Sequence, residues 1–225
     1  MKGRKTFLVA AVAVLFCSAA VFAEGMPMYL KGTLGWENRW SVFDYEYEYE
    51  YTDVETTRVP PYYKEVTRTA KVNGSYGDYS GRFVLNPGIG MVFKPDSDNI
   101  FLKGLGAEAS LGIGFGSISN SYIDSGVFSL VPRVNAVWHL FFGDAKFGDG
   151  KQKFVPHAVL GFEIPIQVPF DSDLSTAVSF GLDTGVGVTF NLNDKLGLVA
   201  DFNWTLPFGN AYGISLTAGA TYRLK

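Results

Sequence analysis

Cysteine and histidine are scarce in this sequence of 225 residues, which has one cysteine, Cys17, and two histidines, His139 and His157. Because Cys17 lies in the N-terminal leader described below, disulfides and thiol chemistry are not expected in the mature chain. Two histidines without a close carboxylate or thiolate make a weak metal site. Neither histidine has an identifiable serine nucleophile and acid partner. We therefore expect no enzyme activity, no metal site and no cofactor.

Long apolar runs are absent after residue 23, so a transmembrane helix is not expected there. The one such run is N-terminal, where MKGRK precedes TFLVAAVAVLFCSAAV and the small-residue exit VFA. This order is typical of a secretory signal peptide, and it predicts a leader over residues 1–23 with cleavage after Ala23. Lipoprotein processing at Cys17 is the alternative, but the bulky Phe16 disfavours it. Residues 24–225 would then form one domain.

Basic residues are outnumbered by acidic ones. The whole chain has 19 Lys and Arg against 22 Asp and Glu, and loss of Lys2, Arg4 and Lys5 with the leader leaves 16 − 22 = −6. An acidic chain is a poor match for nucleic acid or for an anionic membrane surface. We therefore expect neither of these as a partner.

Strict alternation of apolar and polar residues dominates the mature chain. AVSFGLDTGVGVTFNL (177–192) has Val, Phe and Leu on one face and small or polar residues on the other, and 196–208 and 212–225 repeat this division. Alternation with period two is typical of β-strands. These stretches are longer than the five or six residues of an ordinary strand.

The placement of aromatic residues separates two all-β architectures. A soluble barrel or sandwich would turn the apolar face inward, whereas a membrane barrel turns it outward and fills the interior with small and polar groups. The four tryptophans lie on the apolar face, mostly near strand ends, and the glycines and ionisable residues prefer the other face. A membrane barrel is favoured over the soluble alternative. The predicted fold is all-β, an eight-stranded antiparallel transmembrane barrel with strands over 28–43, 80–93, 100–116, 127–142, 155–168, 177–192, 196–208 and 212–225.

The first predicted connection contains DYEYEYEYTD (44–53), which alternates tyrosine with acidic residues. With both termini in the periplasm, this connection lies outside the cell as a long hairpin folded about Val59–Pro61. One register sets Glu55 opposite Lys64, Glu48 opposite Lys71 and Glu37 opposite Arg82, so opposite charges meet across the strands. Two interpretations stay open: a solvated hairpin, or a contact surface for a partner. The candidate contact residues are Tyr45, Tyr47, Tyr49 and Tyr51.

Parity within the predicted strands also assigns an inward face. Ionisable residues in an eight-stranded lumen must be paired or hydrated, and the space suits a side-chain plug better than a wide pore. Pairing about the fourth turn sets Arg133 opposite Glu163 and His139 opposite His157. A structural network and a narrow conducting path both remain open. The predicted lumen network comprises Arg82, Glu108, Arg133, Asn135, His139, His157, Glu163, Asp183, Asp201 and Arg223.

The last strand carries a more specific pattern, TAGATYRL (217–224). Thr217, Gly219, Tyr222 and Leu224 resemble the C-terminal assembly signal of small bacterial outer-membrane β-barrels of the eight-stranded OmpA, OmpX and OmpW type, although here Lys225 follows the last hydrophobic residue. The resemblance implies a location in the bacterial outer membrane, with membrane lipid and the barrel assembly machinery as partners.

Three functional classes follow from these patterns. The hairpin favours a structural or surface-interaction barrel with a possible extracellular partner. A narrow channel, or a transporter of small or hydrophobic molecules as the OmpW-type resemblance implies, is the alternative, and inward Val137, Phe141 and Val199 would give it a little apolar lining. An outer-leaflet lipid-modifying enzyme is the third class, but it would need a nucleophile at the rim that the sequence does not present.

Overall fold

The alternating segments form ten antiparallel β-strands. The computed structural model describes residues 26–56, 60, 62–119, 124–171, 174–207 and 212–224, so the predicted signal peptide lies outside the described residues. The side chain of Tyr45 also lies outside them. The strands are β1 (Met28–Thr56), β2 (Tyr63–Val92), β3 (Leu105–Ser119), β4 (Asp124–His139), β5 (Phe154–Glu163), β6 (Ile166–Pro169), β7 (Ala177–Val178), β8 (Gly181–Asn191), β9 (Leu196–Pro207) and β10 (Tyr212–Leu224).

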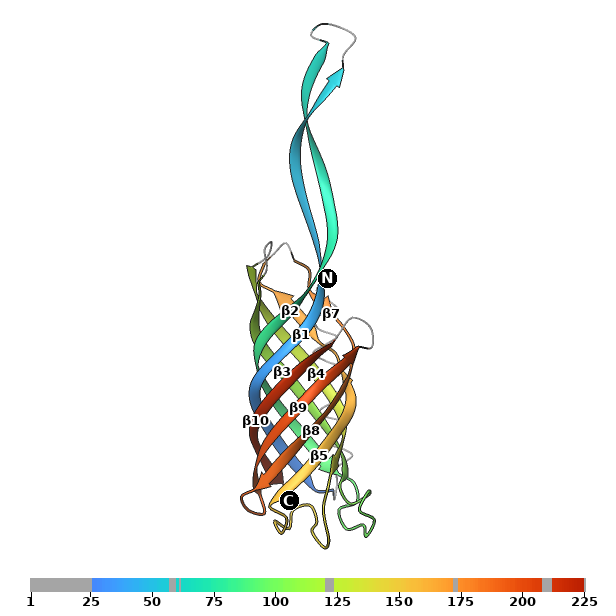
Figure 1. Cartoon of the computed structure of the whole chain (residues 1–225), viewed down its shortest axis with the longest axis vertical. Coiled ribbons are helices and arrows are strands. Elements are labelled where there is room, and N and C mark those ends of the chain that lie inside the picture. Colours follow the sequence, from blue (N-terminus) through green and yellow to red (C-terminus); the bar gives the residue numbers. More distant parts are fainter. Residues whose placement is uncertain are drawn as a thin grey trace.

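The strands close into a barrel. β1 pairs with both β2 and β10, and β3 pairs with β4 to complete the ring. β5 and β6 both pair with β4 and form one wall strand interrupted at Ile164–Pro165, where proline has no N–H to donate. β7 and β8 likewise form one wall strand interrupted at residues 179–180. The ten segments therefore make eight wall strands, which confirms the predicted eight-stranded antiparallel barrel (Figure 1).

Some predicted strand limits are wrong. The strand expected over 100–116 starts at Leu105, because Asn99 redirects the chain: its side-chain oxygen accepts a hydrogen bond from Phe101 N at 2.9 Å, and its carbonyl accepts one from Leu102 N at 3.0 Å. The strand expected over 127–142 runs from Asp124 to His139. The loop between these two strands, expected over 117–126, is shorter because Ser117, Ile118 and Ser119 continue the ladder.

The barrel is apolar outside and polar inside. Along β10, Ile214 and Leu216 are 54% and 65% exposed, whereas Ser215 and Thr217 are buried. Aromatic side chains mark both edges of the apolar outer surface, with Trp40 stacked on Tyr212 toward the hairpin end and Phe101 against Trp138 toward the other. Such a surface belongs against lipid. Among the described residues, no helix is long and apolar enough to cross a membrane.

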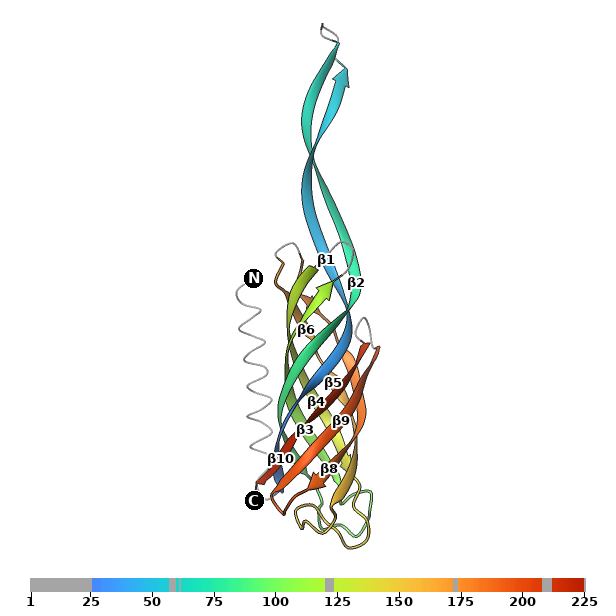
Figure 2. The ribbon, with the colours of Figure 1, turned by 60° about the vertical axis from the view of Figure 1, so that its left-hand side comes forward.

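The two ends of the barrel differ. β1 and β2 continue far beyond the wall as a twisted two-stranded ribbon, whereas Met28 pairs with Leu224 at the opposite end (Figure 2). Both described chain ends thus lie at the end away from the ribbon. We call this the periplasmic end, and the ribbon end the outer end, as in barrels whose termini face the periplasm.

Candidate functional site: the outer hairpin and the polar lumen

The outer hairpin is the part of β1 and β2 that pairs with no other strand. The ladder of β1 with β10 ends at Trp40, and that of β2 with β3 starts at Gly81, so residues 41–56 and 63–80 form the hairpin. At about 3.3 Å per residue, its longer described limb has a length of about 60 Å beyond the wall. A turn was predicted at residues 59–61, most of which lie outside the described residues.

The register of the hairpin is the one that its charges predicted. Glu55 lies opposite Lys64, Glu48 opposite Lys71, and Glu37 opposite Arg82. Every residue of β1 has a partner on β2, without a bulge. Because residues directly opposite in an antiparallel pair share a face, this register divides the hairpin into two chemically different faces.

The tyrosine face contains Tyr47, Tyr49 and Tyr51 on β1, with Val72 and Ala70 opposite the first two. The tyrosine rings follow one another at centroid distances of 6.2 and 6.0 Å. The three tyrosines are 48%, 46% and 42% exposed.

Toward its tip the tyrosine face carries two acidic and two basic side chains, whose charges cancel. Asp53 and Glu55 lie on β1, and Arg68 and Lys64 on β2. Arg68 bridges both acids, with Nε 3.0 Å from Asp53 and Nη2 2.6 Å from Glu55. The four charges near the tip of the tyrosine face therefore sum to zero.

The opposite, acidic face contains Glu46, Glu48 and Glu50 on β1. Lys71 Nζ lies 2.6 Å from Glu48 and 3.3 Å from Glu46. Hydrogen bonds to Glu48 and Glu46, together with their negative charges, raise the pKa of Lys71 above its usual value. With Glu65 also on this face, the side chains that the structure describes there include four acids and one lysine, so the face is negative.

Inside the barrel, the structure places all ten predicted lumen residues with buried side chains. The outer half of the lumen holds three arginines and three acids. Arg133 is central: it donates to Glu163 at 3.0 Å, to Glu37 at 3.0 Å and to Asn86 at 2.9 Å. The three arginines and three acids together carry no net charge. The members of this outer network are Glu37, Arg39, Arg82, Arg133, Glu163 and Asp183.

A second buried network occupies the periplasmic half. Lys31 Nζ lies 3.2 Å from Glu108 and 3.0 Å from Asp201. Asp201 is also 2.7 Å from Nε2 of His157, and the hydroxyl of Tyr29 donates to Glu108 at 3.0 Å. Each carboxylate thus has two partners, as buried charges require.

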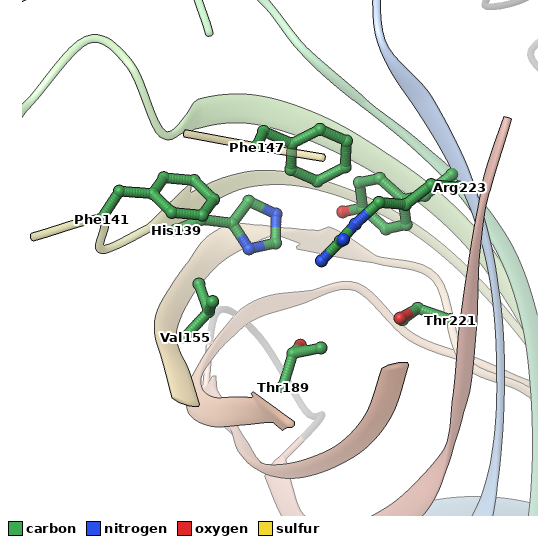
Figure 3. Close-up of a pocket in the computed structure, with 8 residues that line it drawn as sticks. His139, Phe141, Phe147, Val155, Thr189, Thr221 and Arg223 are labelled. Carbon is green, nitrogen blue, oxygen red and sulfur yellow. The ribbon is translucent and has the colours of Figure 1, made fainter. Parts of the chain in front are cut away.

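The periplasmic end of the lumen is closed by the connection between β4 and β5. Gly143, Gly148 and Gly150 adopt positive φ there, which glycine does without strain. The turn carries Phe147 under the barrel, where the Arg223 guanidinium lies 5.1 Å from its ring centroid. Figure 3 shows this ring beside His139, around a cavity of about 20 Å³, close to the space that one water needs. His139 and His157 lie opposite each other, as predicted, with ring centroids 5.6 Å apart.

An apolar cluster lies at the other end of the barrel. Ile118 and Val127 are fully buried and pack with Leu174 and Ala177 near the outer rim. Val137, Phe141 and Val199, predicted to point inward, are also buried. The predicted apolar side chains do point inward, but they are buried by packing.

Four members of these networks were not among the predicted lumen residues: Tyr29, Glu37 and Arg39, which are buried, and Lys31, whose side chain is 10% exposed. The signal was available, because Trp36 and Trp40 were assigned to the outer face and the odd-numbered residues of this strand therefore point inward. The predicted register set Glu37 opposite Arg82, but Glu37 itself was not predicted to lie in the lumen. Within the described ranges, no group of three or more His, Cys, Asp or Glu side chains is placed to hold a metal ion.

The predicted assembly residues lie on β10, the strand that closes the barrel against β1. Thr217 is buried and Tyr222 is 46% exposed on the outer surface. Gly219 lies against the backbone oxygen of Gly32, which leaves no room for a Cβ atom. Leu224 pairs with Met28 at the periplasmic end.

No protein-family model matches the chain, and no curated protein sequence is similar to it. Solved structures with a similar arrangement include Neisserial surface protein A (TM-score 0.49, 10% identity, covering 88% of this chain and 97% of that one). Ail of Yersinia pestis, solved with the heparin analogue sucrose octasulfate, has a TM-score of 0.45 at 11% identity over 86% and 99% of the two chains. OprG of Pseudomonas aeruginosa has a TM-score of 0.42 at 13% identity over 88% and 96%.

The nature of the molecule rests on its own geometry. Eight wall strands close a ring, apolar side chains cover its outside, and paired charges fill its inside. This inside-out distribution is that of a barrel embedded in lipid. The chain therefore has the fold of the small outer-membrane-type β-barrels.

Proposed function

We propose that this outer-membrane barrel acts through its outer hairpin, as an extracellular contact surface. The observation that carries the proposal is the tyrosine face, where Tyr47, Tyr49 and Tyr51 stand in one row and remain nearly half exposed. Tyrosine supplies a large contact area at low cost in conformational entropy. The barrel then serves as the anchor that holds this face away from the membrane.

The other features of the hairpin support this role. An isolated two-stranded hairpin is at best marginally stable in water, but this one continues a ladder that starts inside the barrel wall. Acidic residues on the opposite face keep a long exposed ribbon soluble and oppose unspecific edge pairing. A rigid, soluble ribbon with one aromatic face suits recognition better than a slack loop does.

Outer-membrane lipid and the barrel assembly machinery are the other partners that we propose. Lipid would cover the apolar outer surface, and the machinery would read Thr217, Gly219, Tyr222 and Leu224. Nucleic acid is not proposed, because the chain is acidic. Catalysis is not proposed either.

The channel alternative has less support. The outer network fills the outer half of the lumen with three arginines and three acids, while packed apolar side chains lie at both ends. A transporter of hydrophobic molecules would need an open apolar path, and the cluster of Ile118, Val127 and Leu174 is buried. We therefore assign the lumen a structural role.

Tyrosine nitration on intact cells tests the contact surface. If the face is in contact, Tyr47, Tyr49 and Tyr51 are nitrated more slowly on cells than in the detergent-refolded barrel. Tyr62 and Tyr63 at the tip, 59% and 68% exposed, serve as internal controls that react alike in both. Equal reaction of both groups on cells would contradict the proposal.

A serine variant gives the matching genetic test. Replacing Tyr45, Tyr47, Tyr49 and Tyr51 by serine is expected to abolish surface contact and leave the barrel folded, as seen from its heat-dependent gel mobility. The control is Thr52, Thr67 and Thr69→Ser on the acidic face, which keeps the tyrosines. Unchanged contact in the tyrosine variant would count against the hairpin as the functional surface.

A further inference from the structure

The two strands of the tyrosine face complement each other in shape. The β1 side is bulky, with Tyr47, Tyr49 and Tyr51, whereas the β2 side is low where Val72 and Ala70 stand opposite the first two tyrosines. A ridge thus runs along one strand and a shallow trough along the other. Aromatic against small apolar side chains is a favourable combination between packed sheets.

The charges toward the tip have the same division. The acids, Asp53 and Glu55, belong to β1, and the bases, Arg68 and Lys64, belong to β2. A partner surface with the reverse order would meet both the ridge and the charges favourably. The hairpin itself has that reverse order, once it is rotated by half a turn about its long axis.

Symmetry makes this rotation available to two copies in one membrane. A two-fold axis along the membrane normal keeps both hairpins upright and brings equal heights together. When the tyrosine faces meet, β1 of one copy lies over β2 of the other. Tyr49 then packs on Ala70 of the second copy, and Glu55 faces Lys64 of the second copy.

We propose that the partner of the tyrosine face is the tyrosine face of a second copy in the same membrane. This inference rests on the function proposed above and names its partner. Copies on two facing cells fit less well, because an antiparallel arrangement lays β1 over β1 and sets Asp53 and Glu55 away from Arg68 and Lys64. The charge order therefore selects the upright pair.

The acidic face does not offer the same match. In an upright pair its Glu46, Glu48 and Glu50 would meet a strand on which Lys71 is the one cation facing them. Lys71 is already shared by Glu46 and Glu48. The remaining charges would repel, so only the tyrosine face is suited to self-association.

Membrane confinement explains how a narrow surface could suffice. A ribbon about 10 Å wide and 30 Å long offers roughly 300 Å², against about 800 Å² per partner in a typical stable complex. Both ribbons twist, which limits the contact to the rungs around Tyr49. Two barrels in one membrane meet at high effective concentration and in a fixed orientation. The pair is thus expected in membranes and not in dilute detergent.

Thiol crosslinking of mixed single-cysteine variants tests the geometry. Tyr49→Cys and Ala70→Cys proteins, refolded together in lipid vesicles, should form a crosslinked dimer with a short bismaleimide, which can span the separation of about 10 Å between packed sheets. Each protein carries one of the two cysteines, so a link between these two positions can form only between copies. The matched control is a mixture of Glu48→Cys and Lys71→Cys, a directly opposite pair on the acidic face. We expect at least about tenfold more dimer from the first mixture, the ratio that a preference of 1.4 kcal/mol gives. Gel mobility verifies that all four variants are folded.

Two outcomes overturn the inference. Equal crosslinking of both mixtures would mean random collision, and no crosslinking in vesicles would mean that the copies do not meet face to face. The nitration result separates these from a failure of the proposed function. Tyrosines protected on cells without a crosslink in vesicles would mean that the face binds a different molecule, whereas unprotected tyrosines would remove the contact surface itself.

Discussion

Arg133 Nε donates a hydrogen bond of 3.0 Å to Glu163, the residue directly opposite it on the neighbouring wall strand. Both side chains are buried. Glu163 also accepts from Arg39 at 3.0 Å and from the Thr205 hydroxyl at 2.7 Å. One carboxylate thus compensates two buried guanidinium groups that belong to strands on different sides of the lumen.

Glu163→Gln is therefore expected to destabilise the barrel strongly. The change leaves a buried positive charge without compensation, which costs about 3–5 kcal/mol in buried ion pairs. Urea unfolding in lipid vesicles, followed by tryptophan fluorescence, measures the free energy. The control is Glu65→Gln on the exposed hairpin, for which a change within about 0.5 kcal/mol is expected. Similar small changes in both variants would show that water in the lumen replaces the lost partner.

The refolded protein is expected to be electrically silent in a planar bilayer. The outer network fills the lumen, and the turn carrying Phe147 closes the periplasmic end. The double variant Glu37→Ala, Arg133→Ala removes one acid and one base, so it keeps the charge balance while opening space for water. Small discrete current steps are expected from this variant alone. Steps from the unaltered protein that change when Arg133 or Glu163 is neutralised would instead favour the channel.

Much of this arrangement could be predicted from the sequence because a strand has period two. Parity placed Arg133 and Glu163 inside, and the charge pattern set the register of the hairpin. The turn before Leu105 could not be predicted, because Ile100, Phe101 and Leu102 look like strand residues until the hydrogen bonds of Asn99 are known. The packing of Phe147 under the lumen likewise depends on the path of a loop, which has no period.

The lysine of the acidic face offers a measurable pKa. Since Glu48 and Glu46 raise the pKa of Lys71, its pairing stabilises the folded hairpin fully below the unfolded pKa of 10.5, and this contribution is lost as the pH rises through the higher folded value. Replacing both glutamates by glutamine should lower the Lys71 pKa toward 10.5. NMR titration of its ε-methylene group measures the change. The double variant Asp53→Asn, Glu55→Asn, which changes acids on the other face, should leave this pKa nearly unchanged, and an equal fall there would point to the general field of the hairpin.

The C-terminal pattern predicts a separation between folding and assembly. Tyr222 is 46% exposed on the outer surface of β10, where it contributes contact with lipid. Tyr222→Ser should therefore refold into detergent or vesicles nearly as well as the unaltered chain, yet reach the outer membrane of cells in much smaller amount, because the assembly machinery would lose an aromatic recognition group. The matched control is Leu216→Ser, also on the outer surface of β10 and 65% exposed. It loses a comparable lipid contact outside the predicted signal and should assemble better than Tyr222→Ser.

Heat-dependent gel mobility of both variants, in refolding reactions and in isolated outer membranes, gives the two yields. Equal losses in cells would assign Tyr222 to lipid contact alone, and a refolding defect confined to Tyr222→Ser would place its role in the barrel fold and not in recognition.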